Sequence, residues 1–102
     1  MNFYTKQDTS HVMFYRDDLD ATSPEALKKR LTGLHLAVAT NVVITLRDTE
    51  VMHAASLGFI IGFIRTLTLL GKSVSVQTNS SGAILLNFLG LPDFVNLTDG
   101  AN

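Results

Sequence analysis

The 102 residues have the length of one ordinary domain, and 46% hydrophobic and 17% charged residues are typical of a chain with one core. Eight basic and nine acidic residues give a formal net charge of -1, which excludes the long-range positive field typical of nucleic-acid and anionic-membrane binding. Cysteine is absent, which excludes disulfides, thiolate nucleophiles and zinc–thiolate sites. We expect a single cytoplasmic domain over residues 1–102, since residues 1–7 lack the apolar segment of a secretory signal.

Residues 3–8 and 11–16 predict the two strands of a β-hairpin. Both segments are rich in aromatic and β-branched residues, and they flank the turn-forming residues Asp8, Thr9 and Ser10. Val12 and Phe14 alternate with their neighbours and are expected to share the buried face.

A helix is predicted after the hairpin. Thr22 and Glu25 have the spacing of a capping box, and Pro24 suits a first helical turn. An apolar stripe follows at helical spacing, formed by Leu27, Leu31 and Leu34. The basic residues between them lie off this stripe, and we interpret them as a solvated face and not as a phosphate-binding patch: Lys28, Lys29 and Arg30.

The middle of the chain predicts a central strand and a long helix. Residues 41–46 form a β-branched run of the kind found in strands covered on both faces. An apolar helix is expected over residues 55–70, with Gly71 as its C-terminal cap and Lys72 just beyond it. Alternation of valine with polar residues over 73–77 then predicts another strand.

The last quarter predicts a shorter helix and a short strand. Asn79, Ser80 and Ser81 can cap a helix that reaches about Leu89, and Gly90 and Pro92 close it. A final strand is expected over residues 94–97. The order of elements predicts an α/β domain with a mixed sheet of about four to five strands and helices packed on it.

Residues 51–70 are apolar enough to be tested as a membrane span. Gly58 and Gly62 have the spacing of a helix-dimer motif in membranes. However, His53 and Arg65 lie inside the segment, and a charge near a helix centre opposes insertion by about 2.5 to 3.5 kcal/mol. We therefore interpret the segment as a core helix, without direct membrane insertion.

The two faces of this helix predict different roles. Ile60, Phe63, Ile64 and Leu67 share one arc, which we expect to pack on the sheet. The opposite arc is expected to be a partner-binding surface with a shallow floor of small residues. It contains Gly58, Gly62, Arg65 and Thr66, with Ile61 and Leu69 beside them. The alternative is that both glycines permit close packing inside the domain.

Three segments in register with these elements resemble the STAS domain, the family of bacterial anti-sigma-factor antagonists and of the cytosolic tails of sulfate transporters. The sequence Asp18-Leu19-Asp20-Ala21 is similar to the family's G-x-L-D-A segment, with Asp20 at its acidic position, and the resemblance implies that Asp20 is a partner-binding residue. The sequence from His53 to Gly58 stands where the family has D-S-S-G-L-G, and only Leu57 and Gly58 match it. The third segment is similar to the family's closing helix end: Phe88-Leu89-Gly90-Leu91. The resemblance covers most of the chain and implies the STAS fold.

The same resemblance implies that the usual phosphorylation switch of the family is lost. The phosphoacceptor serine corresponds to Ala55, its serine neighbour to Ala54, and the preceding aspartate to His53. Alanine has no oxygen that can accept phosphate. Ser56 follows one position later, either as a shifted acceptor or as an ordinary helix cap.

The resemblance implies a non-catalytic regulatory module that binds a protein partner, such as an anti-sigma-factor kinase of the serine-kinase type. An alternative is a structural subunit that docks on the ATPase of a bacterial lipid-trafficking ABC transporter, and a homodimer remains open. An enzyme is a third possibility, but the sequence has no recognisable nucleophile–base constellation or phosphate-binding glycine loop. We expect no cofactor and no metal site, because His11 and His35 have no metal-ligand spacing. Four carboxylates could serve in general acid–base catalysis, but nothing in the sequence pairs them, and we interpret them as solvated loop residues: Asp17, Asp18, Asp20 and Glu50.

Overall fold

The computed structural model describes residues 2–15, 24–46, 54–88, 90 and 96–99. They form one five-stranded sheet with the strands in chain order, β1 (Asn2–Lys6), β2 (Thr9–Phe14), β3 (Asn41–Leu46), β4 (Ser73–Thr78) and β5 (Asn96–Asp99). β1 is antiparallel to β2, and every later neighbour is parallel. The predicted α/β class, the mixed sheet and the central place of β3 are confirmed.

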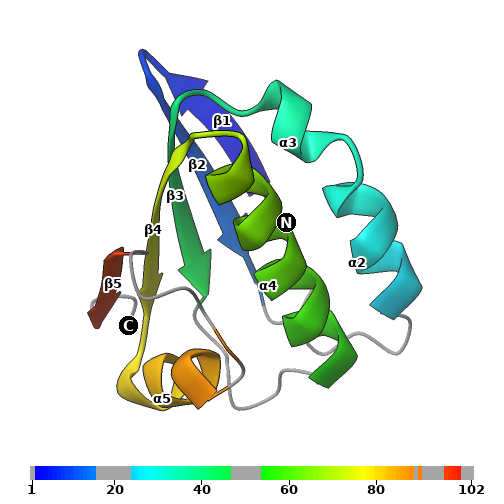
Figure 1. Ribbon diagram of the computed structural model, residues 1–102, viewed down its shortest axis with the longest axis vertical. Helices are drawn as coiled ribbons and strands as arrows, with labels where there is room; N and C mark the ends of the chain where they lie inside the picture. The colour runs from blue at the N-terminus through cyan, green and yellow to red at the C-terminus, as the bar shows by residue number, and fades with distance from the viewer. Residues whose placement is uncertain (1, 16–23, 47–53, 89, 91–95, 100–102) are drawn as a thin grey trace.

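Within the described residues, four helices lie between the strands: α2 (Pro24–Leu31), α3 (Leu34–Ala37), α4 (Ala54–Leu69) and α5 (Ser80–Phe88). Parallel neighbours require a crossover from one end of the sheet to the other, and helices make these crossovers. α2, α3 and α4 lie beside one another on one face of the sheet, whereas α5 lies beyond the carboxyl end of β4 (Figure 1). Within the described part of the chain, no helix has the length and apolar character needed to cross a membrane.

The hairpin turn is tighter than the sequence predicts. Lys6 pairs with Thr9, so the turn consists of Gln7 and Asp8, and Thr9 and Ser10 already belong to β2. Gln7 has a φ of 57°, a left-handed backbone conformation at the first central turn position that suits a two-residue hairpin. The predicted turn at residues 8–10 is therefore wrong by about two residues.

The physical reason for this shift is the buried hydroxyl of Ser10. Its Oγ accepts a hydrogen bond from the Ala39 backbone N–H at 2.7 Å and shares another with Thr5 Oγ1 at 2.7 Å. These contacts satisfy a polar group that is fully buried, so Ser10 is stable inside a strand. They also join the hairpin to the segment that leads into β3.

The predicted helix through Leu34 is two helices. α2 ends at Leu31, and Gly33 has a φ of 86°, a conformation that a continuing right-handed helix does not allow. α3 restarts at Leu34, which is half-buried against the core. The predicted cap Thr22 lies outside the described residues.

The core lies between the sheet and α4. Val42, Ile44 and Leu46 of β3 are buried on one face, and on the other face Thr45 is buried and Val43 is half-buried. The predicted core arc of α4 is confirmed, because all four of its members are buried: Ile60, Phe63, Ile64 and Leu67. α2, α3 and α4 lie on one face of the sheet (Figure 1), and the burial of Thr45 on the other face of β3 is consistent with the predicted cover on both faces.

α4 ends as the sequence predicts. Gly71 has a φ of 81°, its N–H donates to the Thr68 carbonyl at 3.0 Å, and the Lys72 N–H donates to the Leu67 carbonyl at 3.0 Å. This pair of bonds is a Schellman motif, which satisfies carbonyls at the end of the helix. Lys72 Nζ also donates to the Val38 carbonyl at 3.0 Å, which fixes the start of β4 beside the start of β3.

The caps of α5 are also confirmed. Asn79 Oδ1 accepts a hydrogen bond from the Gly82 N–H at 2.8 Å, and Gly90 has a φ of 95° after the last turn. β5 begins at Asn96 and reaches Asp99, later than the predicted strand over residues 94–97. Residues 94 and 95 lie outside the described part of the chain.

Ser10→Ala tests the connection between the hairpin and β3. The change leaves the Ala39 N–H without its acceptor, and we expect the free energy of unfolding to fall by about 1 to 3 kcal/mol in urea denaturation. Ser73→Ala is the matched control, because Ser73 is an exposed strand residue, and its effect should stay within about 0.5 kcal/mol. Equal effects of the two substitutions would contradict the structural role of the Ser10 hydroxyl.

Candidate binding face on helix α4

A line of exposed residues runs along the outer side of α4. Gly58, Gly62, Arg65 and Leu69 follow one another at intervals of three or four residues, which places them on one helix face. All four are exposed, and Leu69 has 87% of its side chain accessible. We call these four residues the α4 stripe, and they are four of the predicted partner-binding residues.

Packing among the described residues does not require the glycines of the α4 stripe. Apart from the backbone of α4 itself, a Cβ atom built at Gly58 or at Gly62 meets no atom of the described residues within 4 Å. Glycine in a helix interior is less favourable than alanine by about 1 kcal/mol per residue. The alternative interpretation, in which the glycines permit close packing inside the domain, is therefore wrong for the described contacts.

Ile61 does not belong to this surface. It was predicted to lie beside the stripe, but it is 5% exposed and belongs to the core cluster. At 100° per residue it lies only about 40° from Leu57 and about 60° from Ile64, both of which are fully buried. The buried arc of α4 is therefore wider than the sheet-facing residues alone indicate, and the prediction for Ile61 is wrong.

Arg65 joins the α4 stripe to α5. Its Nη2 donates a hydrogen bond to the Gly90 carbonyl at 3.1 Å, just after the end of α5. A guanidinium has five N–H donors, so one bond positions the group without exhausting it. A Cβ atom at Gly90 would lie 3.1 Å from the same nitrogen, so glycine at this position also leaves room for the arginine.

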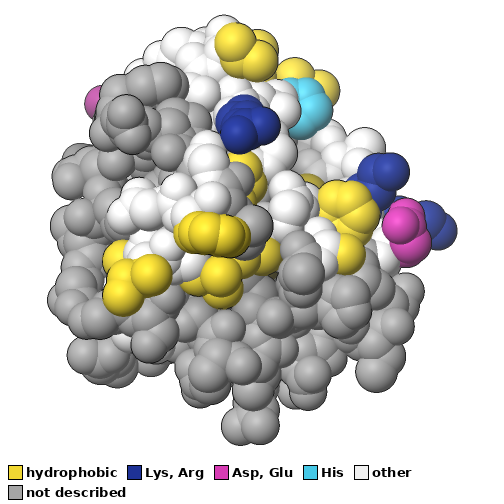
Figure 2. All heavy atoms as spheres, turned by 60° about the horizontal axis from the view of Figure 1, so that its bottom comes forward, with side chains coloured by type: hydrophobic (Ala, Val, Ile, Leu, Met, Phe, Trp, Pro, Cys, Tyr) yellow, Lys and Arg dark blue, Asp and Glu magenta, His cyan; other side chains and the backbone are white. Residues whose placement is uncertain are grey.

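α5 adds two exposed hydrophobic side chains that the sequence analysis missed. Ile84 is 72% exposed and Phe88 is 84% exposed, and they lie one helical turn apart. We call them the α5 patch. Viewed from the end of the molecule where α5 lies, hydrophobic side chains gather on this face with a basic side chain beside them (Figure 2). The signal was present in the sequence, because α5 has apolar residues on more of its circumference than one buried face can cover.

The region predicted to correspond to a phosphorylation site, residues 53–56, includes the start of α4. Ala55, where the resemblance to the STAS family predicts the position of a phosphoacceptor, is exposed, whereas Ser56 is fully buried. Ala54 is the first residue of α4, and His53 and Asp20 lie outside the described residues. The described residues bring together the α4 stripe and Ala55 on one helix, and they give no position for Asp20 or His53.

Ser56 is neither an accessible acceptor nor a helix cap. α4 begins two residues before it, and its Oγ has no hydrogen-bond partner among the described residues. A cap would accept a bond from a backbone N–H of the first turn, and an acceptor would need contact with solvent or a kinase. Both interpretations from the sequence are therefore wrong. Thr78 Oγ1, at the end of β4, is also buried without a partner in the described part.

The described residues contain no group of three or more His, Asp or Glu side chains that could hold a metal ion.

Comparison with known proteins supports the fold. No family model matches the sequence, and no curated protein is significantly similar to it. Among solved structures, the chain is similar to the NMR structure of the protein TM1081, with a TM-score of 0.71 and 18% sequence identity. The similarity covers 95% of this chain and 78% of that chain. At this identity the likeness shows a shared α/β fold with helices packed on a mixed sheet.

Gly58→Ala and Gly62→Ala test whether the fold needs these glycines. Because each added methyl group enters open space, we expect each substitution to raise the free energy of unfolding by about 0.5 to 1 kcal/mol. Thermal and urea denaturation of the two variants measure the change. A loss of stability in both variants would show that the glycines serve packing inside the chain.

Ser56→Ala and Thr78→Val test the two unpaired hydroxyls. Removing a buried hydroxyl that lacks a partner removes its desolvation penalty, so we expect the free energy of unfolding to stay the same or to rise by about 1 kcal/mol. Urea denaturation measures this difference. A loss of more than about 1 kcal/mol in either variant would show that its hydroxyl makes a hydrogen bond in solution.

Proposed function

We propose that this chain is a STAS-type regulatory domain that acts in the cytoplasm by binding a protein partner, an anti-sigma-factor kinase or a related ATPase. The function is binding and not catalysis. The α4 stripe and the α5 patch form the contact surface. The order of strands and helices and the three sequence segments similar to the family support this proposal.

The observation that carries the proposal is the pair of unexplained glycines on α4. Gly58 and Gly62 make the helix less favourable, they are exposed, and no atom of the described chain approaches the space where their side chains would be. A partner that packs closely against the helix backbone gives this arrangement a physical reason. Leu69, at the end of the α4 stripe, and Phe88 of the α5 patch add exposed apolar surface, and such side chains are typical of contact surfaces.

Binding is proposed to be constitutive. Ala55 occupies the exposed position at the start of α4 where the family resemblance places the phosphoacceptor, and its methyl group cannot be phosphorylated. Ser56 is buried and therefore offers no replacement. Partner concentration would then determine the occupancy of the complex, with no covalent switch at this helix.

The test is a titration of the chain with purified anti-sigma-factor kinases from the source genome, followed by calorimetry. We expect the double variant Gly58→Ala with Gly62→Ala to bind at least about tenfold more weakly while its unfolding free energy stays the same or rises, since two methyl groups prevent close approach. Leu36→Ala is the matched control, because Leu36 is 78% exposed on α3, away from the stripe, and its affinity should be unchanged.

Intact-mass analysis after incubation with the same kinases and ATP belongs to this experiment. Binding without a gain of one phosphate supports constitutive occupancy, and phosphorylation of the chain at any serine would contradict it. Binding that does not depend on Gly58 and Gly62 would contradict the proposed surface. Binding to the ATPase of a lipid-trafficking ABC transporter, with none to the kinases, would replace the proposed partner by the alternative.

A further inference from the structure

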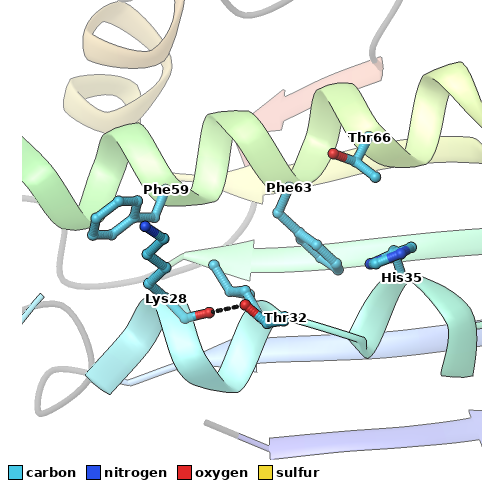
Figure 3. Close-up of a pocket in the computed structure, with 7 residues that line it drawn as sticks. Lys28, Thr32, His35, Phe59, Phe63 and Thr66 are labelled. Carbon is cyan, nitrogen blue, oxygen red and sulfur yellow. Dashed lines mark hydrogen bonds between the residues drawn. The ribbon is translucent and has the colours of Figure 1, made fainter. Parts of the chain in front are cut away.

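A groove lies between α4 and the helices α2 and α3, on the flank of α4 next to the α4 stripe (Figure 3). Its volume is about 240 Å³. Seven residues line it, four from α2, α3 and the turn between them and three from α4: Lys28, Leu31, Thr32, His35, Phe59, Phe63 and Thr66. Typical ligand pockets are larger, so the groove suits a molecule about the size of one aromatic ring with short substituents.

The floor of the groove is apolar and its rim is polar. Leu31 and Phe63 are buried, and Phe59 is half-buried beside them. The hydroxyls of Thr32 and Thr66 already donate to the carbonyls of Lys28 at 2.9 Å and of Gly62 at 3.0 Å. These hydroxyls can therefore only accept further hydrogen bonds.

The groups that can donate to a ligand lie at opposite ends of the groove. Lys28 points toward Phe59 at one end, and His35 lies near Phe63 and Thr66 at the other (Figure 3). The Lys28 ammonium is 5.7 Å from the centre of the Phe59 ring, a cation–π distance that holds the charge beside the aromatic wall. An imidazole has at least one N–H in either protonation state, so His35 can donate as well.

The only charged side chain among the seven lining residues that is always ionised near neutral pH is the cationic Lys28. None of the seven lining residues is acidic, and α2 has three basic residues in its last turn. An apolar floor with a cation at one end is complementary to a molecule with an apolar body and one anionic end. Lys28 was predicted to belong to a solvated face. The groove could not be predicted from the sequence of α2 alone, because its aromatic wall comes from α4.

We propose that this groove binds a small aromatic carboxylate, independently of the proposed protein partner. The carboxylate pairs with Lys28, the ring lies against Phe59 and Phe63, and a hydroxyl or carbonyl at the far end of the ligand accepts from His35. Charge-assisted hydrogen bonding to Lys28 supplies the preference for an anion, and the two rings supply the preference for an aromatic body.

The experiment follows amide chemical shifts of the whole chain during titration with 4-hydroxyphenylacetate. Neutral 4-hydroxyphenylacetamide is the comparison compound, because it has the same ring and lacks the charge. We expect saturable shifts confined to residues 28–35 and 59–66, with a dissociation constant of about 1 mM for a ligand of this size, and at least about tenfold weaker binding of the amide.

Lys28→Met retains most of the apolar stem and removes the charge, so it should weaken binding of the carboxylate about tenfold without changing binding of the amide. Lys29→Met is the matched control, since Lys29 is the next residue of α2 and does not line the groove, and it should leave the affinity unchanged. No saturable shifts, equal binding of acid and amide, or equal effects of the two methionine variants would each overturn the proposal. Shifts elsewhere on the chain would overturn it too.

Discussion

The packing of α4 against the parallel strands is the constraint on which the rest of the structure depends. Ile60, Ile64 and Leu67 are fully buried in the same cluster as the buried side chains of β3 and β4. The Schellman motif at Gly71 fixes where the helix stops, so β4 starts in register beside β3. Because the inner side of α4 is held in this way, its two other sides are presented as rigid surfaces. One of them carries the α4 stripe, and the other forms a wall of the groove.

Elements with a strong local signal could be predicted from the sequence. The alternation in β4, the apolar arc of α4 and the capping residues Gly71 and Asn79 depend on neighbours in the chain, and they were predicted to within about one residue. The hairpin turn and the break at Gly33 could not be located in this way. The first depends on the bond between Ser10 and Ala39, which lie far apart in the sequence, and the second on how α2 and α3 follow the sheet.

The same distinction applies to the candidate site. Helical periodicity placed Gly58, Gly62, Arg65 and Leu69 on one outer face, but it could not show that Ile61 is inside, because the width of a buried arc depends on every element packed against the helix. The α5 patch could not be predicted, because the sequence does not show which side of α5 meets the core. The groove depends on three helices, α2, α3 and α4, that lie in different parts of the chain, and a pattern within one segment cannot show that they meet.

The order of the strands has a consequence for synthesis of the chain on the ribosome. The hairpin of β1 and β2 is local, but β2 pairs with β3 only after α2 and α3 have been made, and β3 gains its second neighbour only after α4. A nascent chain that ends shortly after Leu46 has a strongly apolar central strand with one edge unpaired and with its covering helix still missing. Aggregation and chaperone recognition should therefore concentrate in the interval of translation between β3 and β4, and they should end when α4 closes the core.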